Sequence, residues 1–223
     1  PCAPAPNGLV SWWSGQGNAN DLLGANPGTV QNGVGFVSGK IEAAFNFDAG
    51  AYVRVGAAPS LTMSNSFSVE LWLYPTGPGG APTYGGILIN KEGQYELARF
   101  ADGTIQWAVA TPGNPVWDWV NSGFVAPTGQ WTHLAWTYDF GTSRLFANGQ
   151  LVQTYPGSGA VGSLAVYSPN EFWIGNRQDV SASQWFQGRL DEISIYSRAL
   201  GAAEIQAIFA AGSAGKCVIS NPP

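Results

Sequence analysis

The 223-residue chain is poor in charge, with only 10% charged residues and a net charge of −5, against roughly 25% in ordinary soluble proteins. Its three lysines offer no basic stripe for phosphates or anionic lipid, so we exclude nucleic acids and membrane surfaces as partners. No apolar run approaches the ~20 residues that span a bilayer. The length suits one large all-β domain, and we predict a single domain over residues 1–223 with its core at about 8–212.

Alternating apolar and polar residues predict strands along most of the chain. In SFSVELWLY, residues 66–74, every second side chain from Phe67 to Leu73 is apolar, which is the period of a strand with one face on a core. Many short strands between turn clusters such as YPTGPGGAP and TPGNP favour an all-β sandwich. The same alternation predicts further strands over residues 44–48, 52–55, 104–110, 131–138 and 192–196.

Two local signals complete the prediction of secondary structure. The dipeptide Asn148-Gly149 lies between two apolar stretches in RLFANGQLV, as in a two-residue type I′ hairpin, where both residues take positive φ. Residues 202–212 place Ile205 and Ile208 on one helical face and end in Gly212, a suitable C-terminal cap. We therefore expect one short helix near the C-terminus.

The two cysteines, Cys2 and Cys217, lie near opposite ends of the chain. A sandwich whose first and last strands are neighbours can join them, so we predict a disulfide between them. Two free thiols near flexible ends are the alternative. A disulfide would indicate an oxidising compartment, secreted or periplasmic.

Eight segments follow one another along the chain: LVSWW (9–13), GNANDLLG (17–24), GKIEAAFNFD (39–48), YVRVGAAPSL (52–61), SFSVELWLYP (66–75), QWTHLAWTYD (130–139), RLFANGQLV (144–152) and GRLDEISIYSRALGAAEI (188–205). Together they resemble the laminin G-like domains, of the concanavalin A-like lectin and glucanase type, found in many large bacterial secreted proteins. The resemblance covers nearly the whole chain. It implies an antiparallel two-sheet jelly-roll β-sandwich with six or seven strands in each sheet.

The resemblance also implies a structural calcium site near the chain ends. Ca²⁺ takes about 6 to 8 oxygen ligands, mostly carboxylates with carbonyls and amides. We carry over Asp21, in the loop after the first strand, and Asp191, in the last strand, as ligands. Asn18 or a neighbouring carbonyl would complete the shell. The alternative is that these are a hydrogen-bonded turn Asp and a surface Asp.

Catalytic patterns are missing from the sequence. His133 is the only histidine and lies in the middle of the strand WTHLAW, which favours a packed or hydrogen-bonded role over that of a general base. Glycosidases need two carboxyl groups flanking the scissile bond, and jelly-roll glucanases carry them on one strand as E-x-D-x-E. SVELWL, QYELARF and RLDEIS lack this pattern, and His133 lacks the flanking Q-x-H of similar lyases. We predict that the chain is not an enzyme, and a hydrolase or lyase is the least favoured alternative.

The ten tryptophans point to a ligand, because an indole ring can stack on a sugar while its N–H binds polar partners. Most of them are expected in the core. VWDWV places Trp117 and Trp119 on one face beside the TPGNP turn, where we predict a sugar platform. Trp185 lies in a polar loop near Arg177 and Gln178, whose guanidinium and amide suit sugar hydroxyls. Strand packing and loop anchoring are the alternatives.

We therefore predict a non-catalytic, lectin-like carbohydrate-binding module of a larger secreted bacterial protein, monomeric as an isolated domain. The scarcity of Lys and Arg favours neutral polysaccharides or glycans over acidic ones. Calcium and the disulfide are expected to stabilise the module. The main alternative is a protein-interaction or adhesion module, as laminin G-like domains often are.

Overall fold

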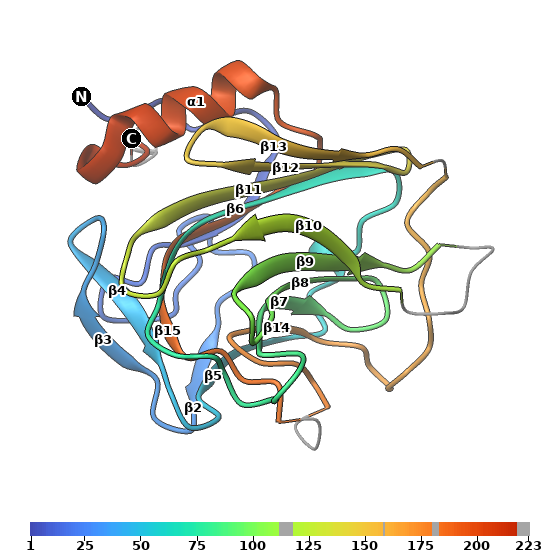
Figure 1. The fold of residues 1–223 in the computed structure, drawn as a ribbon, viewed down its shortest axis with the longest axis horizontal. Helices are drawn as coiled ribbons and strands as arrows, with labels where there is room; N and C mark the ends of the chain where they lie inside the picture. The colour runs from blue at the N-terminus through green and yellow to red at the C-terminus, as the bar shows by residue number, and fades with distance from the viewer. Residues whose placement is uncertain (112–117, 158, 180–182, 218–223) are drawn as a thin grey trace.

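The computed structural model describes residues 1–111, 118–157, 159–179 and 183–217 and contains two antiparallel sheets packed face to face (Figure 1). One sheet has eight strands and the other has seven. The eight-stranded sheet arches over the seven-stranded one, as the ribbon shows. The predicted all-β, two-sheet jelly-roll sandwich is confirmed.

Strand β15 lies at the centre of the eight-stranded sheet, because β6, β4 and β1 all pair with it. The pairing is antiparallel throughout. The strands in spatial order are β13 (Gln150–Tyr155), β12 (Thr142–Ala147), β11 (Thr132–Asp139), β6 (Ser66–Pro75), β15 (Gly188–Tyr196), β4 (Ala43–Phe47) and β3 (Gly35–Ser38), with β1 (Leu9–Trp13) beside β15.

The seven-stranded sheet has β7 and β8 near its middle, and every residue of these two strands is buried. Burial on both faces means that other parts of the chain cover the outer face of these strands as well as the inner face. The strands in spatial order are β10 (Val120–Val125), β9 (Thr104–Val109), β8 (Tyr95–Arg99), β7 (Gly86–Lys91), β14 (Phe172–Ile174), β5 (Tyr52–Gly56) and β2 (Thr29–Gln31).

Aromatic rings join the two sheets across the core. Trp13 of β1 stacks on Phe172 of β14 with 5.3 Å between ring centroids. Phe67 of β6 stacks on Tyr95 of β8 at 4.6 Å. Offset stacking at such distances adds about 0.5–1.5 kcal/mol to the burial of each pair, so the aromatics fix how one sheet lies on the other.

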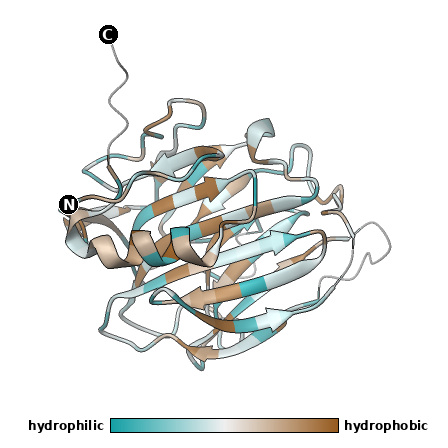
Figure 2. Ribbon diagram, turned by 90° about the horizontal axis from the view of Figure 1, so that it is seen from above, coloured by the Kyte–Doolittle hydropathy of each residue, from teal (hydrophilic) through white to brown (hydrophobic). Residues whose placement is uncertain are grey.

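The outer face of the eight-stranded sheet is covered by helix α1 (Ala202–Ala211), which lies across the strands in Figure 2. Ile205 and Ile208 of the helix are buried against the sheet. The N–H of Gly212 bonds the Phe209 carbonyl at the helix end, as expected of a cap. Two short 3-10 turns, η1 (Pro59–Leu61) and η3 (Gly212–Ala214), complete the elements. No helix of the described residues is long and apolar enough to cross a membrane.

The predicted hairpin is confirmed. Strand β12 ends at Ala147 and β13 begins at Gln150, which leaves Asn148 and Gly149 as a two-residue loop. Their φ values are 50° and 77°. Positive φ at both positions is the type I′ geometry, which costs Asn and Gly little.

A buried ion pair lies on the outer face of the eight-stranded sheet. Lys216 Nζ donates to Glu70 Oε2 at 2.8 Å, and His133 Nε2 lies 2.9 Å from Glu70 Oε1. The three side chains are at most 1% exposed. Burial raises the pKa of Glu70, but Lys216 and His133 outweigh it and hold that pKa below its ordinary value. His133 is therefore a packed, hydrogen-bonded strand residue, as predicted.

The predicted disulfide is present between Cys2 and Cys217, whose Cα atoms lie 5.0 Å apart. Ala3 and Lys216 form a β-bridge beside it, with the Ala3 N–H bonded to the Gly215 carbonyl. The two ends of the chain are thus joined covalently and by backbone hydrogen bonds at one place on the sandwich.

Breaking the disulfide releases a loop of 215 residues in sequence, for which the chain-entropy model gives an upper limit of about 5 kcal/mol. We expect the free energy of unfolding in urea to fall by up to that amount when the domain is reduced. The Cys2→Ser, Cys217→Ser double variant should show the same loss and no further response to reductant. An equal stability with and without reductant would mean that the buried ion pair and the backbone hydrogen bonds hold the ends without the disulfide.

Candidate functional site

Trp119 precedes β10 and packs on the outer face of the seven-stranded sheet. Its ring meets Phe100 edge-on, with 5.2 Å between centroids, and lies against Ile87 and Ala98. Tyr84, which is 46% exposed, contacts the same Phe100. The predicted partner Trp117 lies outside the described residues. Trp119 therefore belongs to a small aromatic cluster with Phe100 and Tyr84, and its contact with a sugar stays a prediction.

Arg177 and Gln178 use their polar groups inside the protein. Arg177 bonds Glu92 at 2.9 Å and Gln184 at 3.3 Å. The Gln178 side chain accepts the N–H of Glu171 and donates to a backbone carbonyl. Both side chains thus anchor their loop, and a role in sugar binding stays a prediction for them.

Trp185 lies in the same loop as Arg177. It is half-buried and packs directly against Gly80, where an added Cβ would come within 2.2 Å of its Nε1. The residue also forms a β-bridge with Ile87. Trp185 therefore helps to attach this loop to the start of β7. Its predicted contact with a sugar is untested.

Two carboxylates come together on the outer face of β7 and β8, although the sequence shows no glucanase pattern there. Asn90 Nδ2 donates to both, at 3.2 Å to Glu92 Oε2 and 2.5 Å to Glu96 Oε1. Arg177 pairs with both, at 2.9 Å to Glu92 and 3.6 Å to Glu96. Burial lowers the pKa of Arg177, but Glu96 and Glu92 outweigh it and raise that pKa overall. The geometry is that of a buried ion-pair network.

The network gives a prediction for stability. Arg177→Ala leaves two carboxylates with side-chain exposures of 3% and 0% without their cation, and removing one partner of a buried pair costs about 3–5 kcal/mol. We expect a loss of that size in chemical denaturation.

The matched control is Arg198→Ala, because Arg198 and Glu204 form an ion pair that is 36% and 35% exposed. An exposed pair contributes about 1 kcal/mol or less. Equal losses in the two variants would contradict the buried network.

The residues predicted to bind calcium are held in a different way. The Asp21 carboxylate accepts three backbone N–H groups at 2.9, 2.9 and 3.1 Å, and Asn18 Oδ1 accepts the N–H of Asn20. Asp191 Oδ2 accepts two backbone N–H groups, and its Oδ1 is buried without a hydrogen-bond partner. Burial is the main cause that raises the pKa of Asp191 to about 7.

Most of these oxygen atoms accept backbone N–H groups, which fits a role in holding loops better than a role as calcium ligands. Among the described residues, no group of three or more His, Cys, Asp or Glu side chains is placed to hold a metal ion. Asn18 and Glu192 line a pocket of about 290 Å³, but neither Asp21 nor Asp191 does. Calcium binding stays a prediction, which a calorimetric titration of the chelator-treated domain would test.

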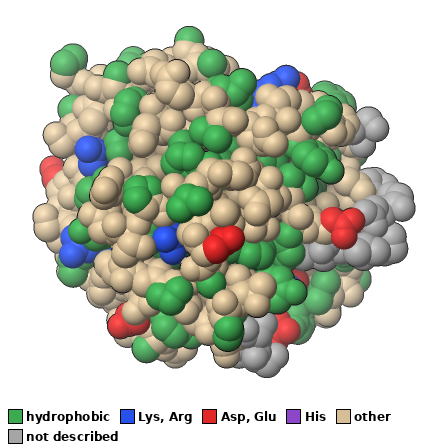
Figure 3. Space-filling view, viewed as in Figure 1, with side chains coloured by type: hydrophobic (Ala, Val, Ile, Leu, Met, Phe, Trp, Pro, Cys, Tyr) green, Lys and Arg blue, Asp and Glu red, His purple; other side chains and the backbone are tan. Residues whose placement is uncertain are grey.

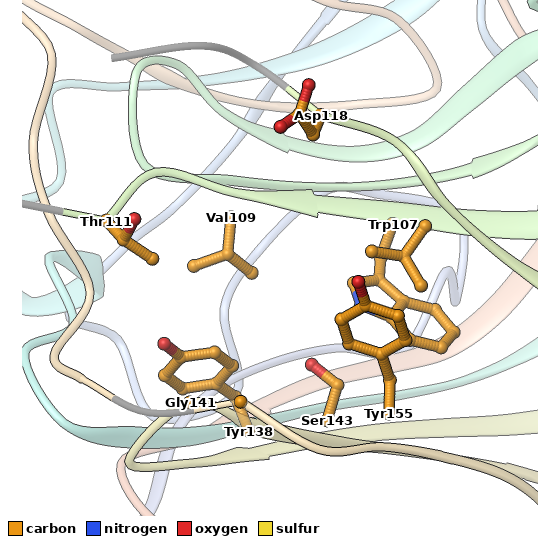
Figure 4. Close-up of a pocket in the computed structure, with 10 residues that line it drawn as sticks. Trp107, Val109, Thr111, Asp118, Tyr138, Gly141, Ser143 and Tyr155 are labelled. Atoms are coloured by element: carbon orange, nitrogen blue, oxygen red, sulfur yellow. The ribbon is translucent and has the colours of Figure 1, made fainter. Parts of the chain in front are cut away.

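A second concave site lies between the two sheets, where β9 and β10 face β11, β12 and β13. It is a pocket of about 180 Å³. Figure 4 shows Asp118 and Val109 on one side and Tyr138, Ser143 and Tyr155 on the other, with Trp107 behind Tyr155 in this view. Thr111, Val120, Gly141 and Gly157 are the other described residues of the lining.

The aromatic walls of this pocket are held by the core. Trp107 stacks on Trp136 with 6.0 Å between centroids and is only 1% exposed. Tyr138 stacks on Phe67 at 5.4 Å, and its hydroxyl donates to the Gly159 carbonyl. Tyr155, the last residue of β13, is 48% exposed and presents the accessible ring. The site thus combines a rigid interior with one open aromatic side chain.

The surroundings of the pocket carry little charge. Asp118 is the one charged residue among the described residues that line it. On the face shown in Figure 3, charged side chains are scattered among more numerous neutral and apolar ones. The pocket is therefore suited to a neutral ligand.

Sequence reasoning did not select Trp107, Tyr138 or Tyr155 as binding residues. Strand alternation places Trp107 and Tyr138 on the inner faces, where an aromatic side chain is normally part of the core. The exposed Tyr155 at the end of a hairpin strand was the available signal.

The family model of the concanavalin A-like lectin/glucanases superfamily matches residues 47–206. The chain belongs to this superfamily. The resemblance noted in the sequence is confirmed. Among curated proteins, none matches the chain.

Several solved structures share the fold. Domain 4 of AbnA, an extracellular GH43 arabinanase from Geobacillus stearothermophilus solved with arabinotriose, is 24% identical with a TM-score of 0.65, covering 89% of this chain and 96% of that one. The binding domain of Paraclostridial Mosquitocidal Protein 1 is 17% identical with a TM-score of 0.69, covering 91% and 52%. Trypanosoma rangeli sialidase, solved with the inhibitor DANA, is 16% identical with a TM-score of 0.66, covering 92% and 33%. This chain is thus similar in length to the arabinanase domain and spans only part of the other two.

Proposed function

We propose that this domain is a non-catalytic carbohydrate-binding module that binds neutral glycans in the pocket of Figure 4. The observation that carries the proposal is the pocket lining, in which the half-exposed ring of Tyr155 lies beside the buried side chains of Tyr138, Trp107 and Ser143. A sugar ring needs an apolar surface for its C–H groups and hydrogen-bond partners for its hydroxyls. Aromatic rings with a polar tip supply both.

The similar solved domains support a binding role in a larger protein. AbnA domain 4 was solved in complex with arabinotriose, and the other domains include toxin binding domains. A fold of this kind hosts many functions, so the proposal depends on the site of this chain. Secretion agrees with the disulfide, since such bonds persist in oxidising compartments.

A non-catalytic role is favoured by the state of the titratable groups. His133, Glu70 and Lys216 are buried in one ion-pair network, and Glu92 and Glu96 share Arg177 and Asn90 in another. A glycosidase needs one carboxylic acid and one carboxylate beside the substrate. Carboxylates held by Arg177 and buried under it are poorly suited to that task.

Tyr155→Ala is the direct test of the site, because this half-exposed residue can be truncated without opening the core. We expect the variant to lose at least about tenfold in affinity for the polysaccharide that retains the wild type, which is ~1.4 kcal/mol. Tyr155→Phe should keep the ring and most of the affinity. The measurement is affinity electrophoresis on arabinan, xylan, galactan, starch and pectin, followed by calorimetry.

Tyr84→Ala is the matched control, because Tyr84 has nearly the same exposure, 46% against 48%, but lies on the outer face of the seven-stranded sheet. It should bind as the wild type does. A loss in Tyr84→Ala or Trp119→Ala, with Tyr155→Ala unchanged, would move the site to the Trp119 cluster. No retention on any polysaccharide would instead favour the protein-interaction module.

A further inference from the structure

We propose that this pocket recognises a single neutral glycosyl residue at the end of a glycan chain, so that the module binds chain termini and not the middle of a chain. The inference rests on the proposed function and specifies its ligand. Its first ground is size: the pocket encloses about 180 Å³, whereas sites that bury drug-sized ligands have roughly 300–1,000 Å³. The space suits one ring-sized unit.

The position of the pocket is the second ground. Its walls come from both sheets, with Trp107 and Val109 on β9 facing Tyr138 on β11 and Tyr155 on β13. A ligand held between two sheets has protein on two opposite sides. Two walls restrict the directions in which a glycan can leave the pocket, and a terminal residue needs one such direction whereas an internal residue needs two.

Backbone closes one part of the lining. Gly141 and Gly157 approach so closely that a Cβ on Gly157 would lie 2.4 Å from the Gly141 carbonyl oxygen. Side chains at Gly157 are therefore excluded, and the wall here is main chain. Main-chain walls cannot rotate away to let a continuing chain pass, which again favours an end residue.

The interior is also rigid. Trp107 is fixed by its stacking on Trp136, and Tyr138 by its stacking on Phe67 and its hydrogen bond to Gly159. Walls held in this way are preorganised and do not widen to follow a larger ligand. Tyr155 is the exposed residue of the three aromatics, and it contacts the ligand at the rim.

The charged groups around the pocket determine which terminal sugars can bind. Asp118 is the charged residue of the described lining, and the chain carries a net charge of −5. A uronate or sialate carboxylate would lose its hydration without meeting a described Lys or Arg in the lining, which disfavours it. Neutral terminal sugars are left as the ligand class.

The test uses the whole domain and two sets of probes. Methyl glycosides of glucose, galactose, mannose, xylose and arabinose, together with free glucuronic and N-acetylneuraminic acids, compete with the retaining polysaccharide. Oligosaccharides of that polysaccharide, from two to six residues long, are titrated by calorimetry. Tyr155→Ala serves as the control for the site.

We expect at least one neutral methyl glycoside to displace the domain completely and both acids to have no effect. Affinity should change less than about threefold as the oligosaccharide lengthens, because added residues lie outside the pocket. Retention that depends on Tyr155 but resists every methyl glycoside and rises more than tenfold with length would overturn chain-end binding and leave the proposed function intact. Absence of retention on every polysaccharide would overturn the proposed function itself.

Discussion

The ion pair between Glu70 and Lys216 is the constraint on which the closed sandwich depends. Glu70 lies in β6, next to the central strand β15, while Lys216 precedes the cysteine that joins the two ends of the chain. Because these side chains are buried, the C-terminal segment cannot leave without removing the Lys216 cation from Glu70 and from Glu192. The disulfide, the bridge between Ala3 and Lys216 and the contacts of Phe209 with Trp72 and His133 all lie around this pair.

Strand alternation divides one segment between two surfaces. Asp118 and Val120 line the pocket between the sheets, whereas Trp119 between them packs on the outer face with Phe100 and Ile87. The same division holds along β9, where Trp107 faces inward. The two faces of the seven-stranded sheet can therefore have different roles. Ion pairs on the outer face hold loops, and the aromatic pocket lies on the inner face near the edge of the sheet.

Sequence reasoning predicted the elements whose pattern depends on local rules. The alternation of residues 66–74 corresponds to β6, the dipeptide Asn148-Gly149 to its hairpin, and residues 202–212 to α1 with its cap. It missed β7, because a strand buried on both faces need not alternate: Ile87, Leu88 and Ile89 read as one apolar run. It also missed the pocket, since the distance between Trp107 and Tyr155 along the chain gives no sign that β9 and β13 meet at the edge of the sandwich.

The contrast between the Glu92 and Glu96 network and the pocket supports the proposal that this domain binds a ligand without acting on it. Glu92 and Glu96 both accept from the amide of Asn90, and Arg177 pairs with both of these buried carboxylates. A general acid requires a raised pKa and access to the leaving oxygen. The pocket has the opposite character, since the half-exposed ring of Tyr155 suits the proposed recognition of a sugar and Asp118 is its one described carboxylate. Because a glycosidase needs two carboxyl groups beside its substrate, a pocket with one described carboxylate agrees with the proposed binding role.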